Sequence, residues 1–356
     1  MKLIDTFNIK TIKSQIYFLK SRLNPSEQNL IIFLNPGYDI VNGGILSIVS
    51  IYNESKMISD IHKSKVLLCS LPGDNIILKY TKFENKALIF TFNEICSYFN
   101  DVDQLILHIP EYAIKQFLFF LNKKQQNFLK SIKNLQINIL LQNIDYLPTL
   151  NDLIRLKKLG YLTCSTAHQK YSNKNMSMIL DCPLKKLSVY LSPEQYKFNG
   201  FKNKKDLMIV SPDYNDKKNE IISQIKKRFP FLKILIIKNV SYQNYKLIIS
   251  KAKWAITFGE GLDGYFLETI YSGGVSFAVY NKRFFTPDFK DLKTVYKDYE
   301  ELFTKICLDI EELNKEDTFK VYQKVEYQLC QKYYQYEKYK ENLINFYKKN
   351  YDFLNQ

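Results

Sequence analysis

The 356-residue chain has few histidines and no closely spaced cysteines. Three histidines argue against a multi-histidine metal site, so we expect no bound metal. A disulfide framework or zinc site needs cysteines close together, for example in a C-x-x-C motif. The six cysteines are instead scattered, at Cys69, Cys96, Cys164, Cys182, Cys307 and Cys330. We therefore expect reduced, mostly buried thiols, which is typical of a cytoplasmic protein.

Long apolar runs are also absent. The longest, such as residues 30–34 and 234–237, fall far short of the roughly 20 residues that a membrane span needs. Asp5, Lys10 and Lys13 interrupt the region where a signal peptide would have its apolar core. The sequence therefore predicts a soluble cytoplasmic protein, with peripheral attachment to the inner membrane face as a further option.

The charge is strongly unbalanced. With 51 Lys+Arg and 36 Asp+Glu, the formal net charge is 51 − 36 = +15. Such diffuse basic charge fits an anionic membrane surface, an anionic substrate or nucleic acid, and a lysine-rich composition alone also explains it. Because no RNP signature, zinc finger or basic helix is present, we expect no nucleic-acid partner.

Short apolar segments alternate with stretches of helical period, at a chain length that suggests two domains. Strands that are apolar on both faces are typical of a parallel sheet covered by helices on both sides. The first set of expected strands comprises residues 30–34, 66–70, 87–90, 105–109, 137–141 and 161–164. After a polar segment, 184–206, the second set comprises residues 207–210, 232–237, 254–258 and 275–280.

The pattern predicts an α/β protein with two doubly wound, Rossmann-like domains, 1–185 and 186–320. The remaining residues, 321–356, contain eight tyrosines and neither glycine nor proline. They predict one or two amphipathic helices that pack back across the domains, with a role at a membrane surface as the alternative.

The segment 258–275 is the most informative part of the sequence. A strand is expected to end at Phe258, before a loop that contains Gly259 and Gly261, and a helix is expected to begin near Gly264. Open α/β sheets bind ligands at the carboxyl ends of their strands. A helix start there presents free N–H groups to an anion, and glycines let a ligand approach the backbone closely.

Glu260 and Glu268 lie eight residues apart in this segment. Two carboxylates directed into one cleft can accept hydrogen bonds from the vicinal hydroxyls of a sugar or a ribose. A chance pair, with Glu268 solvated near the helix start, is the competing interpretation.

The order of strand, Gly-Glu-Gly, second glutamate, short helix, glycine and strand resembles the E-x7-E motif of retaining glycosyltransferase family 4. The resemblance is strong over residues 245–279 and weaker, in the order of elements, over the whole chain. It implies the GT-B architecture, in which two Rossmann-like domains face each other across a cleft. Domain 1–185 would then bind the acceptor and domain 186–320 the nucleotide sugar.

The same resemblance implies roles for individual residues. Glu268 would bind the ribose hydroxyls, and Glu260 would meet the transferred sugar at the reacting face. The backbone of Gly261, Leu262, Asp263 and Gly264 would contact the sugar or the diphosphate. The chain departs from the family pattern where prolines are usual, at Tyr265 or Phe266 and at Val275, which bears on the identity of the donor.

The family also places an arginine and a lysine after the first strand of the second domain. Here no arginine follows that strand, but Lys217 and Lys218 lie at a similar distance and could stabilise the leaving diphosphate without a metal. A solvated lysine pair at a helix start explains them equally well. In the first domain, Gly43 and Gly44 resemble the family's glycine-rich loop, although turn chemistry would also account for them.

Family members often carry a histidine near the reaction centre, at the end of a first-domain strand. His168 and His108 are the two candidates here, and either could instead be a structural histidine. The implied reaction is sugar transfer with retention of configuration. Asp101 and Asp103 have the form of a D-x-D metal motif but precede their strand, which fits a metal-independent enzyme.

The expected partners are a UDP- or GDP-sugar donor and a glycan or lipid-linked acceptor used in cell-surface polysaccharide or glycoconjugate synthesis. An inverting GT-B transferase or a nucleotide-sugar epimerase is the first alternative, and a non-catalytic binding protein of the same architecture is the second. A dinucleotide-dependent oxidoreductase is disfavoured because no G-x-G-x-x-G follows either first strand.

Overall fold

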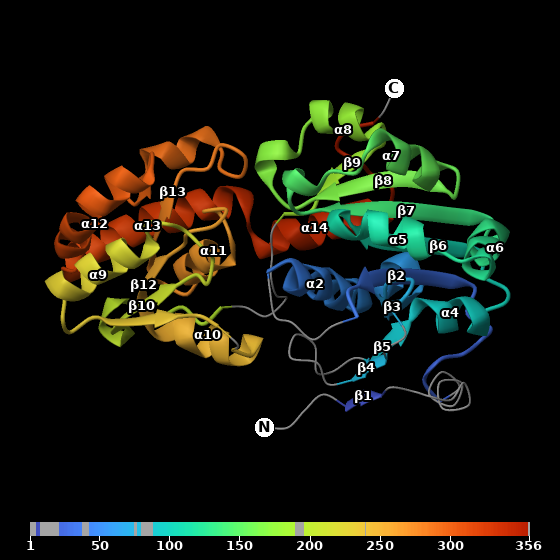
Figure 1. Ribbon diagram of the computed structural model, residues 1–356, viewed down its shortest axis with the longest axis horizontal. Helices are drawn as coiled ribbons and strands as arrows, with labels where there is room; N and C mark the ends of the chain where they lie inside the picture. The colour runs from blue at the N-terminus through green and yellow to red at the C-terminus, as the bar shows by residue number, and fades with distance from the viewer. Residues whose placement is uncertain are drawn as a thin grey trace. The chain divides into compact units, whose positions relative to one another are not determined.

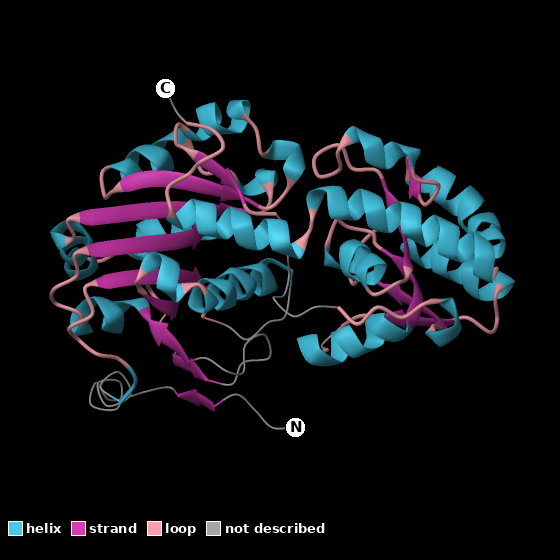
Figure 2. Ribbon diagram, turned by 180° about the vertical axis from the view of Figure 1, so that it is seen from behind, coloured by secondary structure: helices cyan, strands magenta, loops and turns pink. Residues whose placement is uncertain are grey.

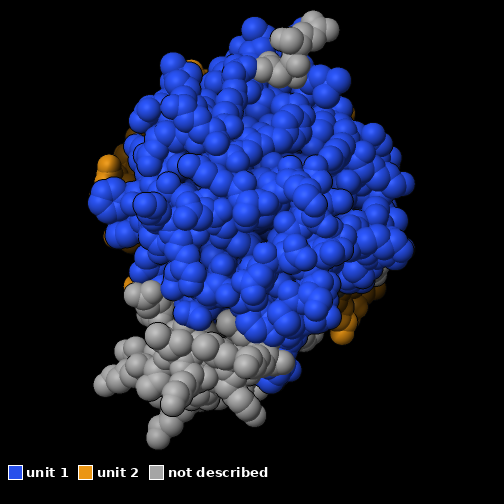
Figure 3. All heavy atoms as spheres, turned by 90° about the vertical axis from the view of Figure 1, so that its right-hand side faces the viewer, with its two compact units in different colours: residues 1–193, 336–356 blue, residues 194–335 orange. Residues whose placement is uncertain are grey.

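The computed structural model describes residues 5–7, 21–37, 43–74, 77–79, 88–188, 196–238 and 240–354. The chain forms two compact units (Figure 3). Unit 1 comprises residues 1–193 and 336–356, and unit 2 comprises residues 194–335. The domain limits predicted from the sequence were 185 and 320, so the boundaries in the structure lie eight and fifteen residues further along the chain.

Unit 1 is built on one sheet with the strand order β1-β4-β5-β3-β2-β6-β7-β8-β9 (Figure 1). The strands are β1 Asp5–Phe7, β2 Asn29–Asn35, β3 Lys65–Ser70, β4 Ile77–Lys79, β5 Leu88–Thr91, β6 Gln104–Pro110, β7 Asn134–Leu141, β8 Tyr161–Thr166 and β9 Leu184–Lys186. The seven strands from β5 to β9 in this order pair in parallel, and β4 pairs antiparallel with both β1 and β5.

Helices cover both faces of this sheet (Figure 2). They are α2 Gly43–Met57, α3 Ser59–His62, α4 Phe92–Tyr98, α5 Ile114–Phe120, α6 Lys123–Ser131, α7 Leu150–Lys157, α8 Lys174–Leu180 and α14 Tyr336–Tyr347. The double cover explains why β2 and β7 are mainly apolar: every residue from Leu30 to Asn35 and from Leu135 to Leu141 is buried, including the polar Gln136 and Asn138.

The sequence prediction was wrong for residues 184–186, which it placed in a linker between the domains. They form β9, the edge strand of the unit 1 sheet, and pair in parallel with β8. Lys185 is buried there, and its ammonium group lies 2.7 Å from Asp352 Oδ1 near the end of the chain. The strand was missed because three residues with two lysines carry no β periodicity of their own.

Unit 2 has a five-stranded parallel sheet in the order β11-β10-β12-β13-β14. Its strands are β10 Lys205–Val210, β11 Lys233–Ile236, β12 Ala252–Ile256, β13 Val275–Val279 and β14 Val295–Tyr296. Its helices are α9 Lys218–Arg228, α10 Tyr242–Lys251, α11 Gly264–Tyr271, α12 Tyr299–Leu313 and α13 Glu316–Tyr333. The predicted doubly wound pattern is confirmed in this unit.

The sequence 321–356 is divided between the two units. Residues 321–333 belong to α13, whose Phe319 packs against the buried Trp254 of β12 with a ring separation of 5.3 Å. Residues 336–356 belong to unit 1 and include α14, where Phe346 and Tyr347 contact His108 of β6 with ring separations of 5.5 and 6.2 Å. The aromatic faces are therefore core surfaces, and the predicted amphipathic helices are confirmed.

All six cysteines lie in described segments, where they are buried and unpaired, as predicted. No helix in the described ranges is both long and apolar enough to span a bilayer. In the same ranges, no three His, Cys, Asp or Glu side chains are grouped so that they could hold a metal ion.

Candidate functional site

The unit 2 sheet has a topological switch point between β10 and β12. The chain passes from β10 to β11 on one side and from β12 to β13 on the other, so the loops that follow β10 and β12 diverge above neighbouring strands. These loops are tied together, because Ser211 N donates to Ile256 O at 3.1 Å and Phe258 N donates to Ser211 Oγ at 3.0 Å. In doubly wound sheets this crevice is where ligands bind.

The glycines of the loop after β12 are required by close packing. Gly261 has φ +83°, and a Cβ there would lie 2.8 Å from Val279 O and 2.7 Å from the ring of Phe285. A Cβ on Gly259 would lie 2.9 Å from the carboxyl carbon of Asp213 in the loop after β10. The glycine spacing that suggested a ligand loop is thus accounted for by contacts within the chain.

Asp263 caps the start of α11 with its own carboxylate. Its Oδ1 accepts the Phe266 N–H at 3.0 Å, and its Oδ2 accepts the hydroxyl of Thr257. Burial raises the pKa of Asp263 to about 7, although both hydrogen bonds favour the charged form. The helix start therefore offers fewer free N–H groups to an anion than the sequence suggested.

Glu268 lies in the second turn of α11, not the first, and its side chain is buried with 2% exposed. Its Oε1 accepts hydrogen bonds from the hydroxyls of Tyr196, at 3.0 Å, and Tyr242, at 2.9 Å. Burial raises its pKa to about 7, and these hydroxyls and Lys246 moderate the rise. Glu260 lies on the loop and is half-buried, so the two glutamates have different surroundings.

The two predicted phosphate lysines also differ. Lys217 is half-exposed and pairs with Glu300 at 2.9 Å and Glu220 at 3.6 Å. The ammonium group of Lys218 is directed inward, where it donates to Ser211 O at 2.5 Å and Asp213 O at 2.8 Å. Lys218 is thus a brace for the loop after β10, while Lys217 remains at the surface.

In unit 1, Gly43 and Gly44 are the first two residues of α2, which follows β2. Gly43 is exposed, and a Cβ there would have no described residue within 4 Å. Packing against the described part of the chain therefore does not require this glycine, in contrast to Gly261. Asn42, which precedes the pair in the predicted motif, lies outside the described residues.

The two candidate histidines are both buried, but they lie at different places on the unit 1 sheet. His108 lies within β6, stacked on Phe33 at 4.2 Å, and its Nδ1 is 3.0 Å from Asn138 Nδ2. His168 follows the carboxyl end of β8. Burial lowers the pKa of each to about 3, so both are neutral near pH 7.

Sequence reasoning missed Glu111, which directly follows β6. Its Oε1 accepts the Asn143 N–H at 2.9 Å from the loop after β7, and burial raises its pKa to about 7. It also missed Tyr196 and Tyr242, the partners of Glu268. A polar residue directly after a buried strand was a signal for Glu111, whereas nothing distinguished these two tyrosines among the 27 in the chain.

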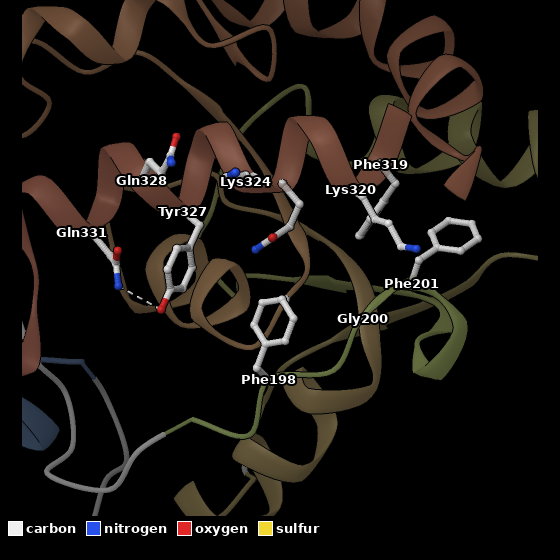
Figure 4. A pocket seen from close by; sticks show the side chains of 11 residues that line it. Phe198, Gly200, Phe201, Phe319, Lys320, Lys324, Tyr327, Gln328 and Gln331 are labelled. Atoms are coloured by element: carbon white, nitrogen blue, oxygen red, sulfur yellow. Dashed lines mark hydrogen bonds between the residues drawn. The ribbon is translucent and has the colours of Figure 1, made fainter. Parts of the chain in front are cut away.

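A cavity of about 650 Å³ lies elsewhere in unit 2, between the segment 198–201 and α13 (Figure 4). Its lining includes Phe198, Phe201, Tyr327 and Gly273. Gly273 precedes β13, so this cavity is at the amino-terminal edge of the sheet, opposite the loops of the switch point.

No protein-family model matches the chain, and no curated protein matches its sequence. Solved structures do match in fold. An alpha-glucosyltransferase in complex with UDP and a 13-mer DNA containing a HMU base has a TM-score of 0.57 and 10% identity, over 89% of this chain and 99% of that one. The DNA-modifying enzyme beta-glucosyltransferase has a TM-score of 0.51 and 14% identity, over 90% and 98%.

Anabaena Alr3699/HepE in complex with UDP-glucose has a TM-score of 0.54 and 9% identity, over 90% of this chain and 99% of that one. At such low identity these matches bear on the fold alone. Together with the two parallel sheets and their covering helices, they confirm the predicted fold class: the chain has the α/β architecture of GT-B glycosyltransferases.

Proposed function

We propose that this protein is a glycosyltransferase that moves a sugar from a nucleoside-diphosphate sugar to an acceptor hydroxyl. The observation that carries the proposal is the loop 257–263 at the switch point of unit 2, which holds Glu260 and leads into the helix of Glu268. Ligands of doubly wound sheets bind at this place. The similar solved structures that contain UDP or UDP-glucose give further support.

In this proposal Glu260 meets the transferred sugar and Glu268 binds the ribose hydroxyls, as the family 4 resemblance implies. Backbone groups of residues 261–264 contact the sugar or the diphosphate. Lys217 is the better placed of the two lysines to approach the diphosphate, because Lys218 is already engaged by two carbonyl groups. The exposed Gly43, whose small size is not required by packing against any described residue, is proposed to allow close approach by the donor or the acceptor.

The proposed reaction proceeds with retention and without a metal. The bond between the anomeric carbon and the diphosphate oxygen breaks, and its electron pair leaves with the nucleoside diphosphate. The acceptor oxygen forms the new bond on the same face, and its proton passes to the departing phosphate. The protein contributes orientation and charge stabilisation, since no side chain is placed as a nucleophile by the sequence motif. His168, at a strand end, is the better candidate of the two histidines for a place near the acceptor.

The acceptor is proposed to be a glycan or a lipid-linked sugar at the inner membrane face, which the charge of +15 would favour. DNA is the second acceptor class to be tested, because one similar structure contains a 13-mer DNA, another is a DNA-modifying enzyme, and the same charge suits DNA. An inverting transferase remains an alternative, and the buried carboxyl group of Glu111 at the carboxyl end of the unit 1 sheet is its most suitable base.

The test is a panel of UDP-, GDP-, CMP- and dTDP-sugars, measured by thermal shift and by turnover, on wild type and Glu268→Gln. We expect one nucleotide series to raise Tm in wild type and less so in the variant. NMR of the product then gives its anomeric configuration. Absence of stabilisation and turnover with every donor would contradict the proposal and favour a non-catalytic binding protein.

A further inference from the structure

The carboxylate of Glu268 is enclosed by tyrosines. Tyr196 and Tyr242 both donate to the same oxygen, Oε1, and their own hydroxyl oxygens are 3.4 Å apart. The other oxygen, Oε2, is buried and accepts no hydrogen bond of ordinary length from the described residues, and the buried hydroxyl of Tyr245, which also lacks such a partner, is close enough to help lower the pKa of Glu268. The hydrogen bonds are thus unevenly distributed, because Oε1 accepts two and Oε2 accepts none of ordinary length. A buried oxygen without a hydrogen bond costs free energy.

This enclosure conflicts with direct ligand binding. With 2% of Glu268 exposed, no ligand hydroxyl can reach its carboxylate while both tyrosyl hydroxyls stay in place. A ligand that binds through Glu268 must therefore replace at least one of them. Such an exchange leaves the number and type of hydrogen bonds to the carboxylate unchanged, because one O–H group replaces another.

The two tyrosines differ in how firmly their backbones are held. Tyr242 is the first residue of α10, whose start is capped by Ser241 Oγ accepting the Asn244 N–H at 3.3 Å. Tyr196 lies in a segment that has neither helix nor strand, just after the chain enters unit 2. Its ring stacks on Tyr271 at 6.0 Å and lies under the ammonium group of Lys246 at 5.3 Å. The ammonium group of Lys246 lies equally far, 5.3 Å, from the ring of Tyr242, so the difference between the two tyrosines is in the backbone. Tyr196, outside helix and strand, is the partner that can move at lower cost.

We propose that, without ligand, the Tyr196 hydroxyl occupies the position on Glu268 that a hydroxyl of the nucleotide sugar takes when bound. The nucleotide sugar displaces Tyr196, while Tyr242 remains as the residue that positions the carboxylate. This inference rests on the proposed function. It gives the ligand a defined chemistry at this point: a pair of neighbouring hydroxyl groups, such as the 2′ and 3′ hydroxyls of a ribonucleoside diphosphate, one for each carboxylate oxygen.

The inference predicts changes of opposite sign for two nearly identical substitutions. Tyr196→Phe removes a hydrogen bond that the donor must break, so UDP binds on the order of tenfold more tightly. Tyr242→Phe removes the hydroxyl that holds Glu268 in the complex, so UDP binds more weakly by a similar factor. If both hydroxyls were only structural, the two variants would change affinity in the same direction or not at all.

Isothermal titration calorimetry with UDP and 2′,3′-dideoxy-UDP at pH 8 tests this in the full chain. We expect Tyr196→Phe to tighten UDP but to leave dideoxy-UDP as in wild type, because a ligand without hydroxyls does not displace Tyr196. Tyr271→Phe is the matched control: its hydroxyl donates to Tyr334 O, away from Glu268, and its ring is kept. We expect it to bind both ligands as wild type does.

Unchanged or weaker UDP binding by Tyr196→Phe, with wild-type binding intact, would overturn the inference and leave the proposed function standing. Equal tightening of both ligands would also overturn it, since the effect would then not depend on the hydroxyls. If wild type binds GDP instead of UDP, GDP and 2′,3′-dideoxy-GDP are the two ligands, with the same expected results. If wild type binds no nucleoside diphosphate, the proposed function itself fails and this inference with it. The Tm of each unliganded variant, expected to stay close to wild type, shows that each is folded.

Discussion

Gly261 and Phe285 pack so closely that a Cβ on the glycine would lie 2.7 Å from the phenylalanine ring. The loop after β12 is thereby held against the segment after β13, with Gly261 at φ +83°. This contact fixes the course of the backbone between Glu260 and α11. The most conspicuous sequence motif of the chain is thus also a rigid structural element of unit 2.

Gly261→Ala should therefore destabilise unit 2 and disturb the candidate donor loop. The strained φ and the clash together cost about 1–3 kcal/mol in the free energy of unfolding. Gly43→Ala is the matched control, because its Cβ would contact none of the described residues and alanine is the better helix former. Guanidinium unfolding measures both variants. A Gly261→Ala protein as stable as wild type would contradict the packing argument, and a loss of donor turnover in Gly43→Ala at unchanged stability would support close approach of a ligand there.

Buried carboxyl groups make the stability of unit 2 depend on pH. Glu326 accepts from Thr294 Oγ1 at 2.7 Å and from Ser276 N at 3.3 Å, and burial raises its pKa to about 8 from the usual 4.5. The folded state therefore holds a proton that the unfolded state releases, so the contribution is present below about pH 4.5 and is lost as pH rises toward 8. We expect the free energy of unfolding to fall over this range, by on the order of a few kcal/mol.

Glu326→Gln should flatten this decline, because the amide does not titrate. The side chain lies in the core between β13 and α13, away from the loops of the switch point, so the measurement is independent of donor binding. Asp263 and Glu268, which also belong to unit 2, have raised pKa values and contribute to the decline that remains. The check is urea unfolding at about pH 5 and pH 8. Stability that rose with pH in wild type would contradict the assignment.

The fold could be predicted from sequence largely because its strands are buried on both faces. Residues 30–34 are a continuous apolar run and residues 137–141 are apolar except for Asn138, and each segment lies inside the strand that the structure shows. β9 and β14 were missed because they are three and two residues long and are defined by their neighbours rather than by their own pattern. The antiparallel edge formed by β1 and β4 was missed for the same reason.

The candidate site was predictable only in part. The segment 258–268 was found because glycines and glutamates stand out beside an apolar strand, and the structure places it at the switch point. Whether Lys218 faced solvent or the loop carbonyls could not be read from a Lys-Lys pair at a helix start. Nor could the enclosure of Glu268, since it brings Tyr196 within hydrogen-bond distance across 72 residues of chain.

Lys218→Met should destabilise the loop after β10 more than Lys217→Met. Removing the Lys218 ammonium group leaves Ser211 O and Asp213 O without their donor, at a cost of about 1–3 kcal/mol in the free energy of unfolding. Lys217 lies at the surface, so its loss should leave that free energy unchanged. Thermal unfolding compares the two variants. Equal stability would show that Lys218 does not brace the loop.

Variants of Lys217 and Lys218 also distinguish a structural role from a role in diphosphate binding. If Lys217 approaches the donor phosphates, Lys217→Met should raise KM for the donor severalfold at unchanged Tm, and the difference from wild type should shrink as salt concentration increases. Steady-state kinetics with the donor that the panel selects, at low and high salt, gives both values. An unchanged KM would assign Lys217 to its surface ion pairs with Glu300 and Glu220 alone.

Donor binding should itself depend on pH through Glu268. Its pKa is raised to about 7 by burial, and only the ionised carboxylate accepts hydrogen bonds on all sides. Affinity for UDP-glucose, whose phosphates do not titrate near neutrality, should therefore rise from about pH 6 to pH 8 and then level off. Glu268→Gln should bind more weakly and show no such rise. Calorimetric titrations across this range would measure it, and the same rise in the variant would place the titrating group elsewhere. Because Tyr196 and Tyr242 donate to the charged form, Tyr242→Phe should move the midpoint to higher pH.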